Sequence, residues 1–314
     1  SSASSALVVA RGDHLTLLNR GKSTLRPPVE GVRQLIGDAD DAVSVTAALG
    51  DETFDVVANF RSFSPSQAAR DIELFDGRCR QYVYISSASA YQKPVARLPI
   101  TESTPLRNPY WQYSRNKIAS EDLLVAANRQ RGFPVTIIRP SHTYDRTSIP
   151  ILGGWTAIDR MRRGLPVVVH GDGTSLWTMT HTRDFAVAFV GLLGNDRAVG
   201  DAFQITSDEV LTWNQITGLL AHAAGAEFRP VHVASEAIAR ELPDEGPGLV
   251  GDKSHSVIFD NTKVKSLVPE YRAVIPFWRG AREIVEWHDA DASRRIVDAE
   301  LDAAFDRLIE RHGR

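Results

Sequence analysis

Cysteine is almost absent from this sequence. The 314 residues include a single cysteine, Cys79, so no disulfide can form within the chain. Such a composition fits a reducing cytoplasm better than an oxidising compartment. Arg78 and Arg80 flank Cys79 and can lower a thiol pKa, but a structural cysteine at the start of a strand is the simpler interpretation.

Long apolar runs and an excess of one charge are also missing. No run approaches the ~20 apolar residues that a membrane-spanning helix needs. Lys and Arg total 36 and Asp and Glu total 39, which gives a formal net charge of -3 at pH 7. This balance gives no general attraction to nucleic acid or to an anionic membrane. We therefore expect a small-molecule substrate, with neither nucleic acid nor membrane as a partner.

Several site motifs are absent as well. No group of His, Cys, Asp and Glu has the spacing of metal ligands, so we predict no metal site. The phosphate-binding pattern G-x-x-x-x-G-K-[ST] does not occur. The first residues also lack G-x-G-x-x-G, the glycine-rich turn that opens a dinucleotide-binding βα unit.

Short apolar runs alternate with polar, helix-like segments from about residue 14 to residue 140. The apolar runs predict buried strands at residues 14–19, 32–38, 54–60, 81–87 and 135–140. The segments between them predict helices at residues 42–49, 65–75 and 113–131. Strands separated by helices are typical of a parallel sheet covered on both faces. The sequence therefore predicts an α/β fold with a doubly wound, Rossmann-type parallel sheet.

The pattern changes after residue 140, where loops lengthen. Helices are predicted at residues 156–163, 181–194, 213–224 and 292–314, and a long polar loop at residues 243–256. We therefore divide the chain into a dinucleotide-binding domain, residues 1–140, and a smaller C-terminal substrate lobe, residues 141–314. Some elements of the second part are expected to return to the first.

The first βα unit of the predicted domain is incomplete. Residues 4–12, SSALVVARG, resemble a shortened form of its helix, with no strand or glycine-rich turn before them. A complete unit needs roughly ten more residues before Ser4. We expect the whole protein to carry such a glycine-rich segment.

Tyr113 and Lys117 form the strongest chemical signal. They are one turn apart on a predicted helix and project from the same face. An ammonium beside a phenol favours the phenolate, so Lys117 is expected to lower the pKa of Tyr113 from ~10 towards the range of an acid/base catalyst. Ser87 ends a predicted parallel strand, where substrates bind in such folds. Its hydroxyl can donate to a substrate oxygen and relay a proton to Tyr113.

The motifs, in their order along the chain, resemble a known family. YVYISSASAY, Tyr113-x-x-x-Lys117, TIIRPSHTYDR and HGDGTSLWTMTHTRDFAVAFVGLL are similar to segments of the extended short-chain dehydrogenase/reductases, which include the NAD-dependent epimerase/dehydratase family. The match is closest to an atypical bacterial group and runs from about Leu15 to Lys265. It implies a catalytic set of Ser87, Tyr113 as general acid/base, and Lys117, which also holds the nicotinamide ribose.

The end of the first strand bears on the choice of cofactor. NAD enzymes carry an acidic residue there for the adenosine ribose, whereas this chain has Asn19. Arg20 and Lys22 follow and can pair with a 2′-phosphate. We therefore favour NADP as the cofactor, with NAD as the alternative. Arg20 and Lys22 can also be part of a solvated basic turn that binds no cofactor. Asp38 stands where the family places an acidic residue beside adenine, although it can equally cap the next helix.

Other cofactor and substrate contacts are predicted at further strand ends. Asn59, Pro140 and His142 complete the predicted cofactor set with Lys117. Arg61, in a bulkier turn than the family usually has, can reach phosphate or substrate. The predicted substrate residues are Ser87, Ser89, His142, Tyr144, Trp155 and Arg183. His142 can bind substrate or serve as an auxiliary acid/base, Trp155 can stack on a ring, and Arg183 can meet an anionic group; packing or solvated positions are the alternatives.

The resemblance implies an NAD(P)-dependent oxidoreductase, epimerase or dehydratase that acts at a carbon–oxygen centre by hydride transfer. Nucleotide sugars are the family's commonest substrates, and the carbonyl group of a secondary metabolite is an alternative substrate. Two alternatives remain: an RNA-binding protein like the chloroplast stem-loop binding proteins, and a cofactor-free scaffold. The family also implies a homodimer through the helices at residues 65–75 and 113–131. Leu123, Leu124 and Ala127 offer an apolar stripe there, unless it only packs on the sheet.

Overall fold

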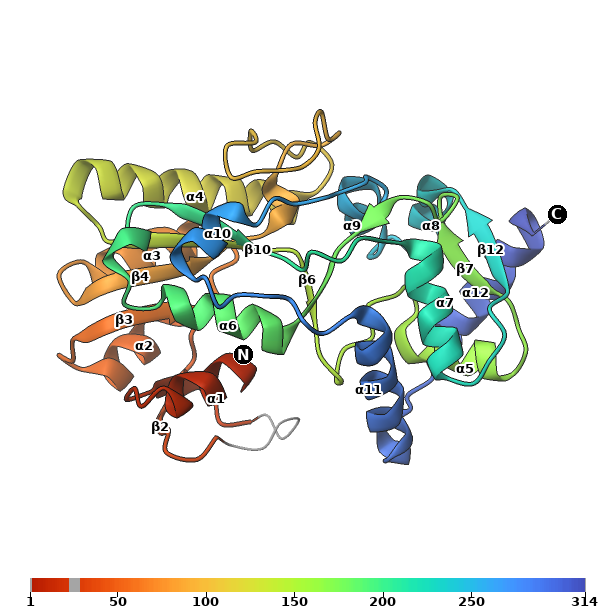
Figure 1. Ribbon diagram of the computed structural model, residues 1–314, viewed down its shortest axis with the longest axis horizontal. Coiled ribbons are helices and arrows are strands. Elements are labelled where there is room, and N and C mark those ends of the chain that lie inside the picture. Colours follow the sequence, from red (N-terminus) through yellow and green to blue (C-terminus); the bar gives the residue numbers. More distant parts are fainter. Residues whose placement is uncertain (1, 23–28, 314) are drawn as a thin grey trace.

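The structure is a computed structural model that describes residues 2–22 and 29–313 of the chain. Its largest sheet has four parallel strands in the order β10-β5-β4-β3, with helices above and below them (Figure 1). These strands are β3 (Phe54–Asn59), β4 (Cys79–Ile85), β5 (Val135–Pro140) and β10 (Ala202–Ile205). The parallel sheet with covered faces confirms the predicted Rossmann-type α/β fold.

A second parallel pair, β1 (Thr16–Asn19) and β2 (Arg33–Ile36), extends this layer. Leu18 and Leu35 of the pair share one hydrophobic cluster with Val57 of β3, and α2 (Ala42–Leu49) joins that cluster. The order β2-β1 followed by β3-β4-β5 corresponds to the doubly wound order 3-2-1-4-5-6, with no described strand in the place of strand 1. For that reason Ala58 of β3 is exposed, whereas its partner Val83 in β4 is fully buried.

The two faces of the main sheet are covered by different helix pairs. Tyr82 and Tyr84 of β4 pack under α3 (Pro65–Phe75) and α4 (Gln112–Arg131), and Val83 between them packs towards α1 (Ser2–Ala10) and α6 (Thr182–Leu192). Successive side chains of a strand point to opposite faces of the sheet, so the consecutive buried residues of β4 pack against the helices on both faces. The start of α3 is fixed by a capping box, in which Ser64 Oγ accepts a hydrogen bond from the Gln67 amide.

The second part of the chain forms a lobe at the opposite end of the molecule from α2 and β3 (Figure 1). Its elements are α5 (Gly154–Arg162), β7 (Val167–His170), α7 (Trp213–Ala223), β12 (Pro230–Val233), α8 (Ser235–Glu241), α11 (Phe277–Asp289) and α12 (Ala299–His312). Short paired strands stand at its border with the sheet: β6 (His142–Tyr144) with β9 (Met179–His181), and β8 (Leu176–Trp177) with β11 (Leu211–Thr212). Strand β10, α6 and α10 (Thr262–Leu267) pack instead on the main sheet.

The expectation of a long polar loop at residues 243–256 is wrong. This segment folds into a short helical turn, α9 (Gly246–Gly248), and a π-helical turn, Leu249–Lys253. A Cβ atom at Gly251 would stand 2.8 Å from the Cβ of Trp111, so glycine is what lets the turn approach the Rossmann-type lobe this closely. The turn thereby comes to line the functional site.

Among the helices of the described residues, none combines the length and the apolar character that crossing a membrane would require.

Helix α11 also needs a glycine for its packing. A Cβ atom at Gly280 would stand 2.2 Å from the hydroxyl oxygen of Tyr144, whose side chain is 1% exposed. We expect Gly280→Ala to lower the free energy of unfolding by about 1–3 kcal/mol, because the buried tyrosine has no free space to move into. Urea denaturation measures this.

Arg282→Ala serves as the control, since that side chain is exposed on the same helix and its replacement should change stability by no more than about 0.5 kcal/mol. Equal stability of Gly280→Ala and the unsubstituted protein would contradict the packing described for Tyr144.

Candidate active site

A cavity of about 430 Å³ opens where β4 and β5 end. The Rossmann-type lobe contributes Ser87, Ser89, Trp111 and Tyr113 to its wall, together with the segment from Pro140 to Thr143. The other wall comes from later in the chain and includes Trp177, Asp252, Lys253 and Phe259. The cavity thus lies at the carboxyl ends of parallel strands, where ligands bind in this kind of fold.

Ser87 follows the last residues of β4 and begins a 3₁₀ turn, Ala88–Ala90. Its Oγ accepts a hydrogen bond from the Ser89 amide (3.1 Å) and lies 2.9 Å from Ser89 Oγ. Ser89 Oγ in turn accepts from Ser114 Oγ of α4 at 2.8 Å. Three hydroxyls therefore form one chain from the strand end to the helix that carries Tyr113.

The pKa of Tyr113 is raised above its ordinary value. Burial is the largest cause, the nearby Asp252 carboxylate adds to it, and a hydrogen bond with Ser87 acts in the opposite direction. The expectation that Lys117 lowers this pKa is wrong for the structure described. The ammonium of Lys117 lies 5.7 Å from the centre of the tyrosine ring and is directed to main-chain oxygens instead.

Lys117 is buried beneath the tyrosine. Its Nζ donates to the carbonyl oxygens of Ser62 and Ile85, both at 2.7 Å. Burial lowers its pKa to about 8, while the carboxylate of Glu121, one turn further along α4, acts to raise it. An ammonium has three donors, so one N–H is left for a ligand hydroxyl.

His142 lies in the cavity wall, as the sequence suggested. Burial lowers its pKa to about 3, and the charge of Lys253 contributes in the same direction. The imidazole is therefore neutral at physiological pH. His142 therefore offers the cavity a neutral hydrogen-bonding group near pH 7, and its role as an auxiliary acid/base stays a prediction.

Three predicted substrate residues do not line this cavity. Tyr144 is packed between Phe277 and His181. Trp155 stacks on His288 inside the second lobe. Arg183 forms an ion pair with Glu283. The sequence also allowed core packing for Trp155, and that interpretation describes the structure.

Predicted cofactor residues gather at the ends of β1 and β2. Asn19 Oδ1 accepts a hydrogen bond from the Gly21 amide (2.8 Å), and Arg20 Nη1 lies 3.9 Å from Asp38 Oδ2. Arg20 and Lys22 are both exposed. An amide, two cations and a carboxylate suit the hydroxyl and phosphate groups of an adenosine ribose, and Lys117 suits a second ribose further along the sheet edge. The residues present therefore fit the two ribose ends of a dinucleotide.

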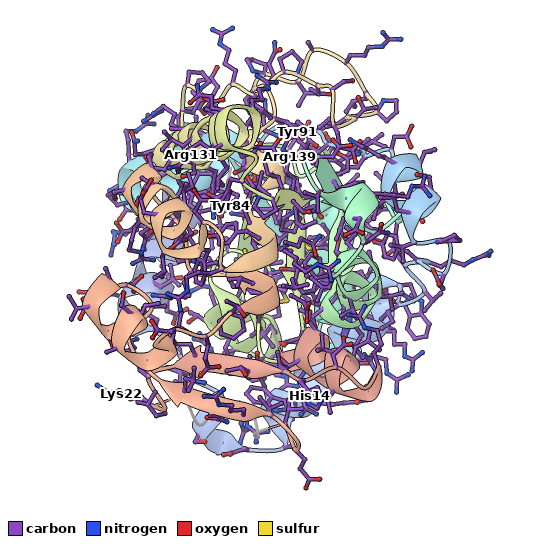
Figure 2. All side chains as sticks on the ribbon, turned by 90° about the vertical axis from the view of Figure 1, so that its left-hand side faces the viewer. His14, Lys22, Tyr84, Tyr91, Arg131 and Arg139 are labelled. Atoms are coloured by element: carbon purple, nitrogen blue, oxygen red, sulfur yellow. The ribbon has the colours of Figure 1, made fainter. Side chains whose placement is uncertain are left out.

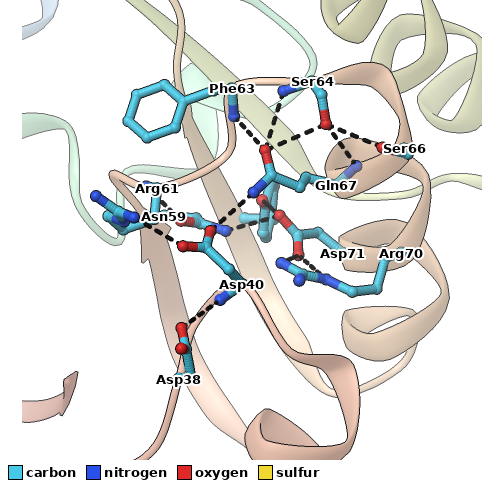
Figure 3. Close-up of polar contacts among 11 residues, drawn as sticks. Asp38, Asp40, Asn59, Arg61, Phe63, Ser64, Ser66, Gln67, Arg70 and Asp71 are labelled. Carbon is cyan, nitrogen blue, oxygen red and sulfur yellow. Dashed lines mark hydrogen bonds and ion pairs between the residues drawn. The ribbon is translucent and has the colours of Figure 1, made fainter. Parts of the chain in front are cut away.

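The end of β3 is occupied by its own polar contacts (Figure 3). Asn59 Nδ2 donates to Asp71 (2.7 Å), and Asn59 Oδ1 accepts from the Arg61 amide (2.7 Å). The Arg61 guanidinium pairs with Asp40 (2.8 Å). The predicted cofactor contact by the Asn59 side chain is therefore not supported, because both of its polar atoms already have partners. Pro140 does lie at the cavity.

Sequence reasoning missed Asp252 and the lysine that holds it. Lys93 is fully buried, and its Nζ lies 3.2 Å from Asp252 Oδ1. Asp252 belongs to the π-helical turn that we took for a loop, and Lys93 looked like an ordinary charged residue after a strand. Trp111 also escaped notice. The glycines at 246, 248 and 251 were the one available signal, since they mark close packing.

Comparison with known proteins identifies the family of the chain. Residues 5–206 match the family model described as "NAD dependent epimerase/dehydratase family". The chain is 29% identical over 315 residues to 2'-dehydrokanamycin reductase of Streptomyces kanamyceticus, covering 98% of this chain and 85% of that protein. It is 28% identical over 233 residues to a chloroplast stem-loop binding protein of Arabidopsis thaliana, covering 70% and 59%.

Among solved structures, the UDP-glucose 4-epimerase of Bifidobacterium longum in complex with NAD+ and UDP has a TM-score of 0.73 at 15% identity. The match covers 93% of this chain and 96% of that one. Likeness at this level of identity concerns the fold. The family match spans most of the Rossmann-type lobe, including the segments that carry Ser87, Tyr113 and Lys117, and the chain therefore belongs to the NAD dependent epimerase/dehydratase family of enzymes.

Proposed function

We propose that this protein is an NADP-dependent reductase that interconverts a ring ketone and its alcohol on an aminated or polyhydroxylated sugar. The observation that carries the proposal is the cavity in which Ser87 and Tyr113 face a wall containing Asp252. The similarity to a 2'-dehydrokanamycin reductase over nearly the whole chain supports this reaction class over epimerisation or dehydration.

The proton chemistry follows from the positions of the hydroxyls. Ser87 donates a hydrogen bond to the substrate oxygen, and Tyr113 delivers a proton to that oxygen during reduction or removes it during oxidation. A bound nicotinamide supplies or accepts the hydride. Lys117 would donate its free N–H to the nicotinamide ribose, while its other two N–H groups bind the carbonyl oxygens of Ser62 and Ile85.

Asp252 gives the proposal its substrate class. Its carboxylate lines the cavity and is held from behind by the fully buried ammonium of Lys93. A carboxylate only accepts hydrogen bonds, so it suits hydroxyl or ammonium groups next to the reacting carbon. It would repel a phosphate placed against it, which disfavours a nucleotide sugar in that position. Lys253 and neutral His142 offer further polar contacts.

NADP is the cofactor we propose, with NAD as the alternative. The end of β1 carries Asn19 where a carboxylate would repel a 2′-phosphate, and Arg20 and Lys22 expose two cations beside it. Asp38 lies 3.9 Å from Arg20, and we assign its carboxylate to the adenine side of the site.

The outer faces of α3 and α4 suggest a homodimer. A groove between these helices is lined by Ile72, Leu123 and Ala127, and Leu123 is 40% exposed. Leu124, also part of the predicted stripe, is instead fully buried against the sheet. We propose that Leu123 and the groove pair with the same surface of a second copy.

The proton-transfer proposal predicts a loss of turnover in Tyr113→Phe. NADPH oxidation is followed at 340 nm with 2'-dehydrokanamycin as the first ketone. We expect kcat to fall by about 100- to 10,000-fold, because the phenol that supplies the proton is gone. Tyr110→Phe is the matched control, since this exposed tyrosine lies outside the cavity wall. Full turnover by Tyr113→Phe would contradict the assignment.

The cofactor proposal predicts stabilisation by NADPH that grows with its concentration in a thermal-shift experiment. Replacing both Arg20 and Lys22 by Ala should weaken NADPH binding by roughly tenfold or more, because each lost charge-assisted hydrogen bond costs about 1.5–3 kcal/mol. NADH binding should stay nearly the same.

A larger shift with NADH than with NADPH would assign NAD instead. No shift with either cofactor, together with salt-sensitive binding of a stem-loop RNA, would favour the RNA-binding alternative that one relative's name suggests.

The dimer proposal predicts the mass of two chains in light scattering. Leu123→Asp should give the mass of one chain, because the substitution puts a carboxylate in an apolar contact. Leu98→Asp is the control, since Leu98 has a similar exposure but does not line the groove. A single-chain mass for the unsubstituted protein would refute the dimer.

A further inference from the structure

A buried ion pair lies directly behind the proposed catalytic residues. Arg139 Nη2 donates to Glu121 Oε2 at 2.6 Å, and Arg139 Nε donates to Glu121 Oε1 at 3.0 Å. Ser86 Oγ donates to the same Glu121 Oε1. All three side chains are buried, with exposures of 2% for Glu121, 6% for Arg139 and 2% for Ser86. None of them lines the cavity.

Arg139 is held on its other side as well. It lies over the ring of Tyr91, 5.0 Å from the ring centre, and donates to the Tyr91 hydroxyl and to the carbonyl oxygen of Glu102. Arg139 and Tyr91 are labelled next to each other in Figure 2. The guanidinium is thus fixed by the end of β5, α4 and the loop after β4. Its neighbour in sequence, Pro140, lines the cavity.

Each member of this cluster is next to a residue of the site. Ser86 precedes Ser87 in the chain, and Glu121 lies one turn beyond Lys117, which itself lies one turn beyond Tyr113. Along this face of α4, Lys117 binds the carbonyl of Ile85 and Glu121 binds the hydroxyl of Ser86. Two consecutive residues at the end of β4 are therefore tied to two consecutive turns of α4.

Stability alone does not account for such a cluster. Two charges taken out of water lose hydration that their mutual attraction barely repays, and apolar residues of similar size are often as good or better for folding. What the pair adds is geometric specificity. A bidentate guanidinium–carboxylate contact restricts how β5, which carries Arg139, and α4, which carries Glu121, can lie relative to each other.

We propose that Glu121 and Arg139 are positioning residues that fix the end of β4, which carries Ser87, against the turn of α4 that carries Tyr113. The proposal concerns the geometry of the site and rests on the proposed function for its catalytic meaning. Glu121 is connected to Ser87 through its hydrogen bond with the adjacent Ser86, and to Tyr113 through the backbone of α4.

The titration of Tyr113 reports this geometry without any substrate. The hydrogen bond from Ser87 lowers the pKa of Tyr113, so a looser strand end raises that pKa. The charged and titratable groups that face the phenol are Asp252 from the π-helical turn, Lys117 from its own helix and Tyr84 from β4. All three are retained in the variants below.

The test is a spectroscopic pH titration of tyrosine at 295 nm. The chain has seven tyrosines, and Glu121 and Arg139 also act on Tyr84 and Tyr91. The difference between each protein and its own version carrying Tyr113→Phe isolates the tyrosine in the site. The main variant is Glu121→Gln/Arg139→Gln, which removes one charge of each sign and leaves the net charge of the cluster unchanged. Ser86→Ala removes only the hydrogen bond between the end of β4 and Glu121. It tests the positioning role if the double variant fails to fold.

We expect both variants to raise the pKa of Tyr113 by ~0.5 unit or more, in the same direction as Ser87→Ala. In the Ser87→Ala background the double substitution should add almost no further shift, because the hydrogen bond it acts through is already gone. Turnover of 2'-dehydrokanamycin should fall roughly tenfold or more, with KM within about twofold.

Arg160→Met/Asp302→Asn is the matched control, since Arg160 is equally buried and paired but lies in the second lobe. The proposal is overturned if Glu121→Gln/Arg139→Gln leaves the titration of Tyr113 unchanged, or if the control shifts it as much. If the double variant shifts the titration of Tyr113 but the unsubstituted protein reduces no ring ketone, the positioning role stands and the proposed function is refuted.

Discussion

The burial of a single ammonium, that of Lys117, is the constraint on which the rest of the site depends. A lysine buried this deeply must find acceptors, and it finds the carbonyls of Ser62 and Ile85 at the carboxyl ends of two neighbouring strands. Because those oxygens are fixed by the sheet, the lysine fixes α4, and α4 presents Tyr113 to Ser87. The clusters above and below the sheet supply the rigidity that this contact requires.

The two lobes divide the work of the site. The Rossmann-type lobe provides the two hydroxyls to which we assign proton transfer, Ser87 at a strand end and Tyr113 on one helix, where small errors in position cost the most. The second lobe provides Asp252 and Lys253 on a π-helical turn, an irregular structure often found at functional sites. Variation in that turn can change which substrate is accepted without disturbing the contact between α4 and β4.

Much of this organisation could be predicted from local sequence. The helices at residues 42–49 and 65–75 were placed at their observed bounds, because apolar periodicity and a Ser-Pro start define them well. Ser87, Tyr113 and Lys117 could be identified because spacing and strand ends place them at one edge. The strand at residues 135–140 was also clear, since it is buried on both faces.

What could not be predicted depends on contacts between distant segments. Trp155 and Tyr144 have the residue types of a binding site, but only the fold shows that they pack against His288 and Gly280. Asp252 lies in a polar stretch whose turn forms by close packing against Trp111. The pKa of Tyr113 was misjudged because spacing on a helix gives the proximity of Lys117 and not the direction in which its ammonium points.

The most direct test of the account is the fate of deuterium from NADPH deuterated at the transferring carbon, with 2'-dehydrokanamycin as the ketone. The account predicts one deuterium in the product alcohol, at the reduced ring carbon, with stoichiometric formation of NADP+, and an initial rate at least about 100-fold lower with Tyr113→Phe. A product that carries no deuterium from the cofactor, or the same initial rate of deuterated alcohol formation with Tyr113→Phe, would contradict it.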